Sequence, residues 1–170
     1  STTAETPAFE HVHGIAQDPN SEKLLVATHN GLFTLARNGI VSGPIAGYDF
    51  DAMGFAVSGK TLYASGHPGM NTPPELGSPN LGLIRSDDQG ESWDSVSLKG
   101  IEDFHVLTAG PDGVLYGIGS SGLNIVSSSD GGMTWESRGT VSAVDLAAND
   151  SGLYAATEQG LQISTDQGLT

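Results

Sequence analysis

One short motif occurs twice in this chain and begins a third time close to residue 170. The copies span residues 86–93, 128–135 and 164–170, and they share the pattern Ser-x-Asp-x-Gly-x-Ser/Thr, which is followed by Trp in the first two. They lie about 40 residues apart, which is the length of one blade of a β-propeller. The repeat therefore predicts an all-β propeller built of four-stranded antiparallel blades.

The chemistry of the motif is that of a tight turn. Ser and Asp side chains accept hydrogen bonds from backbone N–H groups of their own turn. The glycine supplies a positive φ, and the Trp anchors the turn by burying a large ring. We therefore expect structural roles for the motif residues, namely Ser86, Asp88, Gly90, Trp93, Ser128, Asp130, Gly132, Trp135, Asp166 and Gly168.

Four units can be aligned along residues 1–170, which we interpret as a single propeller segment. Each has two short apolar strands, a Gly-Leu step and then the motif or a remnant of it. Evenly spaced short strands of this kind are typical of an all-β repeat. The predicted blades are approximately 8–48, 49–98, 99–139 and 140–170, the last one incomplete. We expect an incomplete ring, about four of six or seven blades, with further blades or a second chain completing it.

Composition excludes several classes of function. The chain has 20 acidic and 6 basic side chains, a formal charge of −14, and no cysteine. Nucleic acid and anionic membranes require basic patches, so we expect neither as a partner. No apolar run has membrane-spanning length, so membrane insertion is not expected. The polar start without Met is typical of a mature exported protein, whether periplasmic, cell-surface or extracellular.

The five histidines fall at related positions of the aligned units. The starts of the first strands align His11, Asp51, Asp103 and Ser142, and two residues later His13, Met53, His105 and Val144. His29 and His67 follow the second strands. In a propeller, first-strand starts and the loops between second and third strands lie on one face. All five histidines are therefore expected at one end of the channel.

This combination of side chains predicts a transition-metal site. Imidazole is a common neutral ligand, and a thioether favours soft copper ions. Copper fits the mixture best, and zinc is the alternative. The expected ligands are His11, His13, His29, Met53, His67 and His105, with Asp51 and Asp103 ligating or orienting the imidazoles from behind. The alternative interpretation is that each histidine is an ordinary polar side chain and that Met53 belongs to the core.

The motif resembles the Asp-box, or BNR, repeat of sialidases, sortilin-type receptors and many exported bacterial propellers. Segments 11–15, 27–33, 64–68 and 103–105 further resemble exported bacterial propellers described as glycosyl hydrolase-like. In that family the box lies at hairpin tips, away from the functional face. The resemblance implies little about activity, because such propellers include hydrolases, receptors and assembly factors.

Three functions stay open: a non-enzymatic metal-binding propeller in metal handling or assembly, a glycan-directed hydrolase or lectin, and a protein-interaction scaffold. Sialidases hold a carboxylate with several arginines, whereas Arg37, Arg85 and Arg138 all fall near the box hairpins or outer strands. This placement argues against sialidase activity. We favour the non-enzymatic metal-binding propeller. The insertion at residues 68–80 is either a tolerated surface loop or a lid over the channel mouth.

Overall fold

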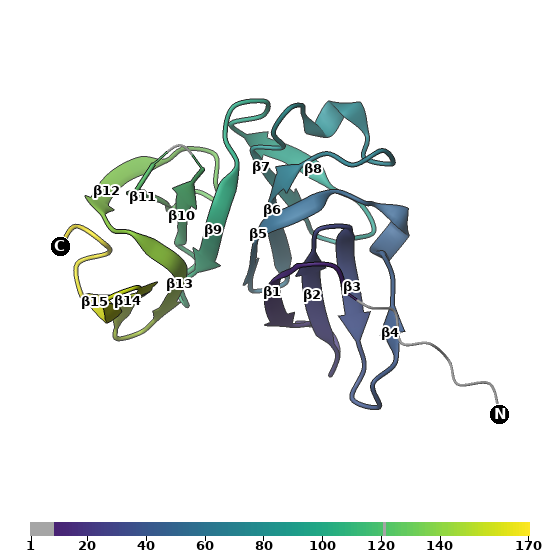
Figure 1. The fold of residues 1–170 in the computed structure, drawn as a ribbon, viewed down its shortest axis with the longest axis horizontal. Helices are drawn as coiled ribbons and strands as arrows, with labels where there is room; N and C mark the ends of the chain where they lie inside the picture. Colours follow the sequence, from purple (N-terminus) through teal and green to yellow (C-terminus); the bar gives the residue numbers. More distant parts are fainter. Residues whose placement is uncertain (1–8, 121) are drawn as a thin grey trace.

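The computed structural model describes residues 9–120 and 122–170 and confirms an all-β propeller (Figure 1). Four antiparallel sheets follow one another along the chain, three with four strands and the last with three. The first blade contains β1 (Val12–Gln17), β2 (Leu24–Thr28), β3 (Gly31–Leu35) and β4 (Val41–Ser42). The second contains β5 (Asp51–Ser58), β6 (Thr61–His67), β7 (Leu83–Ser86) and β8 (Asp94–Ser97). The third contains β9 (Phe104–Ala109), β10 (Leu115–Gly119), β11 (Asn124–Ser128) and β12 (Glu136–Thr140). The fourth contains β13 (Ala143–Asn149), β14 (Gly152–Thr157) and β15 (Gly160–Ser164).

The innermost strands pack in chain order, β1 against β5, β5 against β9 and β9 against β13, so the blades form an arc in Figure 1. Two short 3₁₀ turns, Ile45–Gly47 and Pro74–Leu76, lie in connections. Neither they nor any other described segment forms a helix long and apolar enough to cross a membrane.

Each junction between neighbouring blades has its own hydrophobic core. Side chains alternate along a strand, so Leu62 of β6 packs toward the first blade while Tyr63 packs toward the third. The second strands of the two middle blades, β6 and β10, thus contribute to two cores each. Burial of both faces explains why these strands are nearly continuous apolar runs.

The repeated box forms the same turn in all three copies. In the second copy, Ser128 Oγ donates to Asp130 Oδ1 at 2.7 Å and accepts from the Gly132 N–H at 2.8 Å. Asp130 also accepts from the N–H of Thr134 at 2.9 Å and from its hydroxyl at 2.6 Å. Gly132 has φ of 87°, a conformation that a side chain resists. The turn is thus closed by its own side chains.

The box places an aromatic ring between blades. Trp93 is 7% exposed and packs edge-on against Phe50, with ring centroids 5.3 Å apart. Trp135 lies 4.7 Å from the ring of Phe104, and its indole N–H donates to Ser97 Oγ of the preceding blade. Each Trp therefore helps to hold its own blade against the one before it.

The insertion after β6 is anchored to the fold. The Asp49 carboxylate accepts hydrogen bonds from the Asn71 N–H at 2.9 Å and from the Thr72 hydroxyl at 3.2 Å. Leu76 is buried in the core between the first two blades, whereas Met70 is 99% exposed. The insertion is therefore an ordered surface loop held at both its start and its middle.

Replacing Trp93 with alanine should lower the free energy of unfolding by about 3–5 kcal/mol, because it opens a cavity between two blades. Urea denaturation followed by circular dichroism measures the loss. The matched variant Trp93→Phe keeps most of the buried ring and should lose clearly less. Equal midpoints for the wild type and Trp93→Ala would show that the ring does not hold the blades together.

The side-chain and backbone hydrogen bonds from Thr134 lower the pKa of Asp130 to about 2. Since this pKa lies below that of an unfolded chain, Asp130 stabilises the folded turn at neutral pH, and the contribution is lost as the pH falls through about 2. A carboxyl-detected NMR titration should give this midpoint. Thr134→Val should raise it toward the ordinary aspartate range, and a wild-type midpoint near 4 would contradict the proposed hydrogen bonds.

Candidate metal centre

The start of each innermost strand carries the same irregularity. The pairing of every first strand with its second strand skips one residue, and the skip falls at His13 in β1, His105 in β9 and Val144 in β13. In β5 it falls between Asp51 and Gly54. An extra residue of this kind is a β-bulge, which redirects a side chain at the rim of a sheet. The bulges therefore explain how His13 and His105 can turn out of the regular alternation of their strands.

Asp51 is the centre of the first group of side chains. Its carboxylate is 12% exposed and lies at the junction of the first two blades. The Nε2 atom of His13 is 3.1 Å from Oδ1, and the Nδ1 atom of His29 is 2.9 Å from Oδ2. The ligand atoms of these three residues all lie within 4.8 Å of one another. Two imidazoles and one carboxylate thus converge on one small volume.

Two atoms of this group lack a hydrogen-bond partner among the described residues. They are His13 Nε2 and Asp51 Oδ1, and both are fully buried. Although they are 3.1 Å apart, their geometry is not that of a hydrogen bond. A buried polar atom without a partner costs about 1–3 kcal/mol. The arrangement fits a cation that accepts electron pairs from both atoms better than a direct bond between them.

A second group surrounds Asp103, whose carboxylate is 2% exposed. Its Oδ2 atom is hydrogen-bonded to His105 Nε2 at 2.8 Å and lies 3.3 Å from His67 Nε2. The other oxygen, Oδ1, is buried without a partner. The second group therefore holds His105 firmly and leaves one carboxylate oxygen unused.

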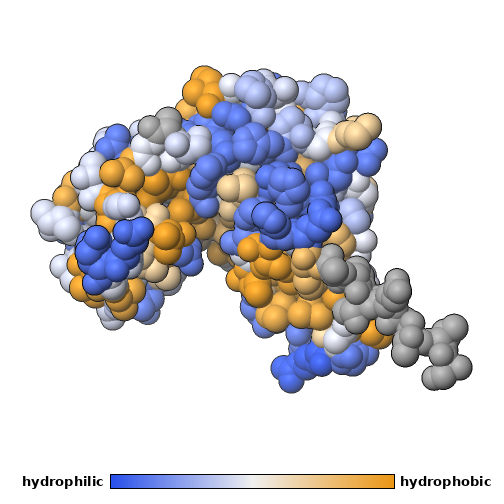
Figure 2. Space-filling model, in the orientation of Figure 1, coloured by the Kyte–Doolittle hydropathy of each residue, from blue (hydrophilic) through white to orange (hydrophobic). Residues whose placement is uncertain are grey.

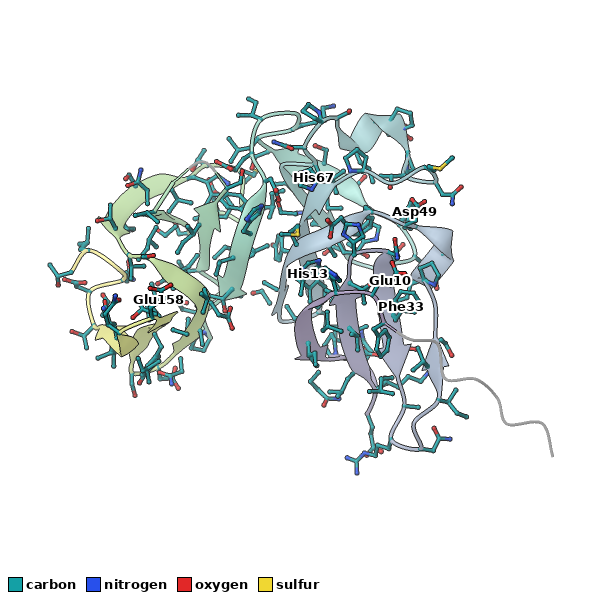
Figure 3. All side chains as sticks on the ribbon, in the orientation of Figure 1. Glu10, His13, Phe33, Asp49, His67 and Glu158 are labelled. Carbon is teal, nitrogen blue, oxygen red and sulfur yellow. The ribbon has the colours of Figure 1, made fainter. Side chains whose placement is uncertain are left out.

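His67 connects the two groups. Its Nδ1 atom lies 3.9 Å from Asp51 Oδ2, and its Nε2 atom faces Asp103. One imidazole ring therefore stands between the two carboxylates. Figure 3 shows His67 and His13 close to β5, with Glu10 nearby and Glu158 apart on the fourth blade.

Backbone contacts fix the position of His29. Its N–H donates to the carbonyl oxygens of Glu10 at 3.3 Å and of His11 at 3.1 Å. His11 itself adopts φ of 46°, which is unusual for a residue with a side chain. The His11 ring centroid lies 6.0 Å from that of His29 and 6.5 Å from that of His13. The three rings of the first blade therefore form one cluster.

The sequence placed these histidines at one end of the channel, and the structure brings together the five histidines and the two aspartates. Of the two roles left open for Asp51, ligating or orienting, its position directly among the nitrogen donors suits the first. Met53, which the sequence also offered as a ligand, is half-buried in the bulge of β5. The sequence signal for the role of Asp51 was its alignment with His11, whereas the bulges had no recognisable signal.

No known protein-family profile matches the chain, and no curated protein matches it. Solved structures do share its fold. A GH74 enzyme of Niastella koreensis aligns with a TM-score of 0.65 and 17% identity, covering 94% of this chain and 23% of that one. The GH74 xyloglucanase of Xanthomonas campestris gives 0.60 and 18%, covering 95% of this chain and 30% of that one.

Another match is the extracellular domain of a putative one-component system of B. thetaiotaomicron. It aligns with a TM-score of 0.59 and 12% identity, covering 90% of this chain and 21% of that domain. The chain thus spans about a quarter of the length of these proteins. At such low identity the likeness establishes the propeller fold alone.

Proposed function

We propose that this propeller binds a divalent transition-metal ion at the junction of its first two blades, through His13, His29 and Asp51. The observation that carries the proposal is the pair of buried atoms without hydrogen-bond partners, His13 Nε2 and Asp51 Oδ1, which lie 3.1 Å apart. A metal ion satisfies both atoms at once, and His29 Nδ1 supplies a second nitrogen beside them.

The donor atoms determine which ions fit. Two imidazole nitrogens and a carboxylate suit Cu²⁺ and Zn²⁺, and Cu²⁺ binds such a site more tightly. The sequence-based preference for soft copper depended on Met53, whereas the present proposal uses only the nitrogen and oxygen donors that converge. We therefore propose a divalent ion, with copper ahead of zinc. His67, 3.9 Å from Asp51 Oδ2, is the neighbour that best serves as an additional ligand.

The second group supports the first. The Asp103–His105 hydrogen bond and the approach of Asp103 to His67 fix the far side of the His67 ring. Partners of this kind orient ligands and tune their basicity. We assign Asp103 and His105 to this supporting role.

Metal handling outside the cytoplasm is the role that this site favours. The net charge of −14 attracts cations over the whole surface, and one of the similar structures is an extracellular domain. Since the ligands come from rigid strand ends and a short turn, the site resembles one made for holding an ion rather than for transforming a substrate. Export and the non-enzymatic role are both parts of this proposal.

A glycan-directed function is the second candidate, because the similar structures include GH74 enzymes. Glycoside hydrolases usually place two carboxyl groups on opposite sides of the scissile bond. In this chain, Asp51 and Asp103 are on opposite sides of the His67 ring, which fills the space between them. This geometry favours metal binding over hydrolysis by that pair.

Purified protein should bind close to one equivalent of Cu²⁺, and Zn²⁺ more weakly, in isothermal titration calorimetry. Electron paramagnetic resonance of the copper form should show coupling to imidazole nitrogens. Binding should weaken on acidification, because protonated imidazole cannot ligate. Absence of stoichiometric binding of either ion would overturn the proposal.

Variants separate ligands from supporting residues. His13→Ala should lower the affinity for Cu²⁺ by more than about 100-fold, whereas His105→Gln should lower it by about 10-fold, the range seen for residues behind a ligand. Glu158→Gln is the matched control, since Glu158 follows β14 as His29 follows β2. Thermal denaturation checks folding. An equal loss in the His13 and Glu158 variants would contradict the assignment.

A further inference from the structure

An apolar pocket of about 100 Å³ opens between the third and fourth blades. Its walls include Ile125 of the third blade and Leu146, Leu153 and Ala155 of the fourth. These residues also belong to the core at this junction. Unlike the cores at the two preceding junctions, the core at this junction contains no tryptophan.

The repeat shows what occupies the same place in the other blades. Trp93 packs with Leu62 and Ala64 of β6 in the core between the first two blades. Trp135 packs onto the core that contains Leu115 of β10. Three leucines are equivalent, because each pairs across the sheet with the first serine of its box. The pairs are Leu62 with Ser86, Leu115 with Ser128 and Leu153 with Ser164. The pocket at Leu153 is therefore equivalent to the two sites that the indole rings of Trp93 and Trp135 fill at the preceding junctions.

The box next to the pocket is already formed. Ser164 donates to Asp166 at 2.6 Å, and Thr170 donates its hydroxyl to Asp166 at 2.6 Å, as Thr134 does to Asp130. Gly168 and Thr170 both line the pocket. Thr170 is equivalent to Thr134, which directly precedes Trp135. The turn therefore shapes this pocket in the same way as the boxes that accommodate an aromatic ring.

The neighbouring strand edge is also free within the described residues. In the second and third blades, β8 and β12 pair with β7 and β11 as outermost strands. In the fourth blade, β15 is the last strand, and its residues from Gly160 to Ile163 are exposed. An unpaired edge beside an apolar pocket is the arrangement used in recognition by strand addition. Figure 2 shows apolar surface on this part of the molecule, at the left of the view.

We propose that this pocket and the edge of β15 together bind an extended polypeptide segment that begins with an aromatic residue, with tryptophan as the best fit. The ring fills the pocket, and the residues after it pair antiparallel with β15. The segment comes from outside residues 1–170, because the two tryptophans of this stretch are already seated between their own blades. A second copy of residues 1–170 is therefore a poor donor.

The probe is an acetylated and amidated hexapeptide that copies residues 135–140, Trp-Glu-Ser-Arg-Gly-Thr. Methyl NMR of the protein should show saturable shifts at Leu153 and Ala155 when the peptide is added. A peptide with alanine in place of the tryptophan should bind at least about tenfold more weakly, since large aromatic rings dominate such contacts.

A pair of protein variants on one strand makes the test specific. Ala155→Phe fills the pocket and should abolish the shifts, whereas Ala156→Phe places the same ring on the opposite face of β14 and should leave them. Circular dichroism and the shifts of the first blade confirm that both variants fold. Absence of binding at a peptide concentration of about 1 mM would overturn the proposal. So would equal binding of the two peptides or equal binding by the two variants.

Discussion

Burial of both faces of each blade is the constraint on which the architecture depends. A four-stranded sheet with apolar residues on both sides is stable only when it is covered twice, and successive blades provide that cover. The alternation of Leu62 and Tyr63 between two cores shows how a single strand serves both junctions. The same constraint explains the ends of the arc, where Ile15 of the first blade is 62% exposed and Leu161 of the fourth is 73% exposed.

The repeat made the fold predictable from the sequence. Motif spacing, the Gly-Leu step and the short apolar runs each report a local property, and local properties recur in every blade. The expectation of antiparallel four-stranded blades agrees with three of the four sheets observed, and the last sheet has three strands. The Asp-box relationship itself, by contrast, stays a resemblance, because the structural neighbours establish only the propeller.

The site was predictable only in part, for a physical reason. Alignment of strand starts brought His13 and His105 to one face, since equivalent positions in a repeat occupy equivalent places. It did not reveal the bulges that turn these side chains, because an extra residue in one strand is visible only against its partner. It also left two roles open for Asp51, ligating or orienting, and the distances place its carboxylate among the imidazoles.

The position of Asp51 has a mechanical consequence. His13 and His29 belong to the sheet of the first blade, while Asp51 begins the sheet of the second, and the two sheets share no strand pairing. Apolar packing resists separation of two such sheets, but the hydrophobic effect itself has no direction. A directional contact across the seam is different, since it fixes how far one sheet is shifted along the other. The contacts of Asp51 with His13 and His29 thus act as a registration point between two blades that share no strand pairing.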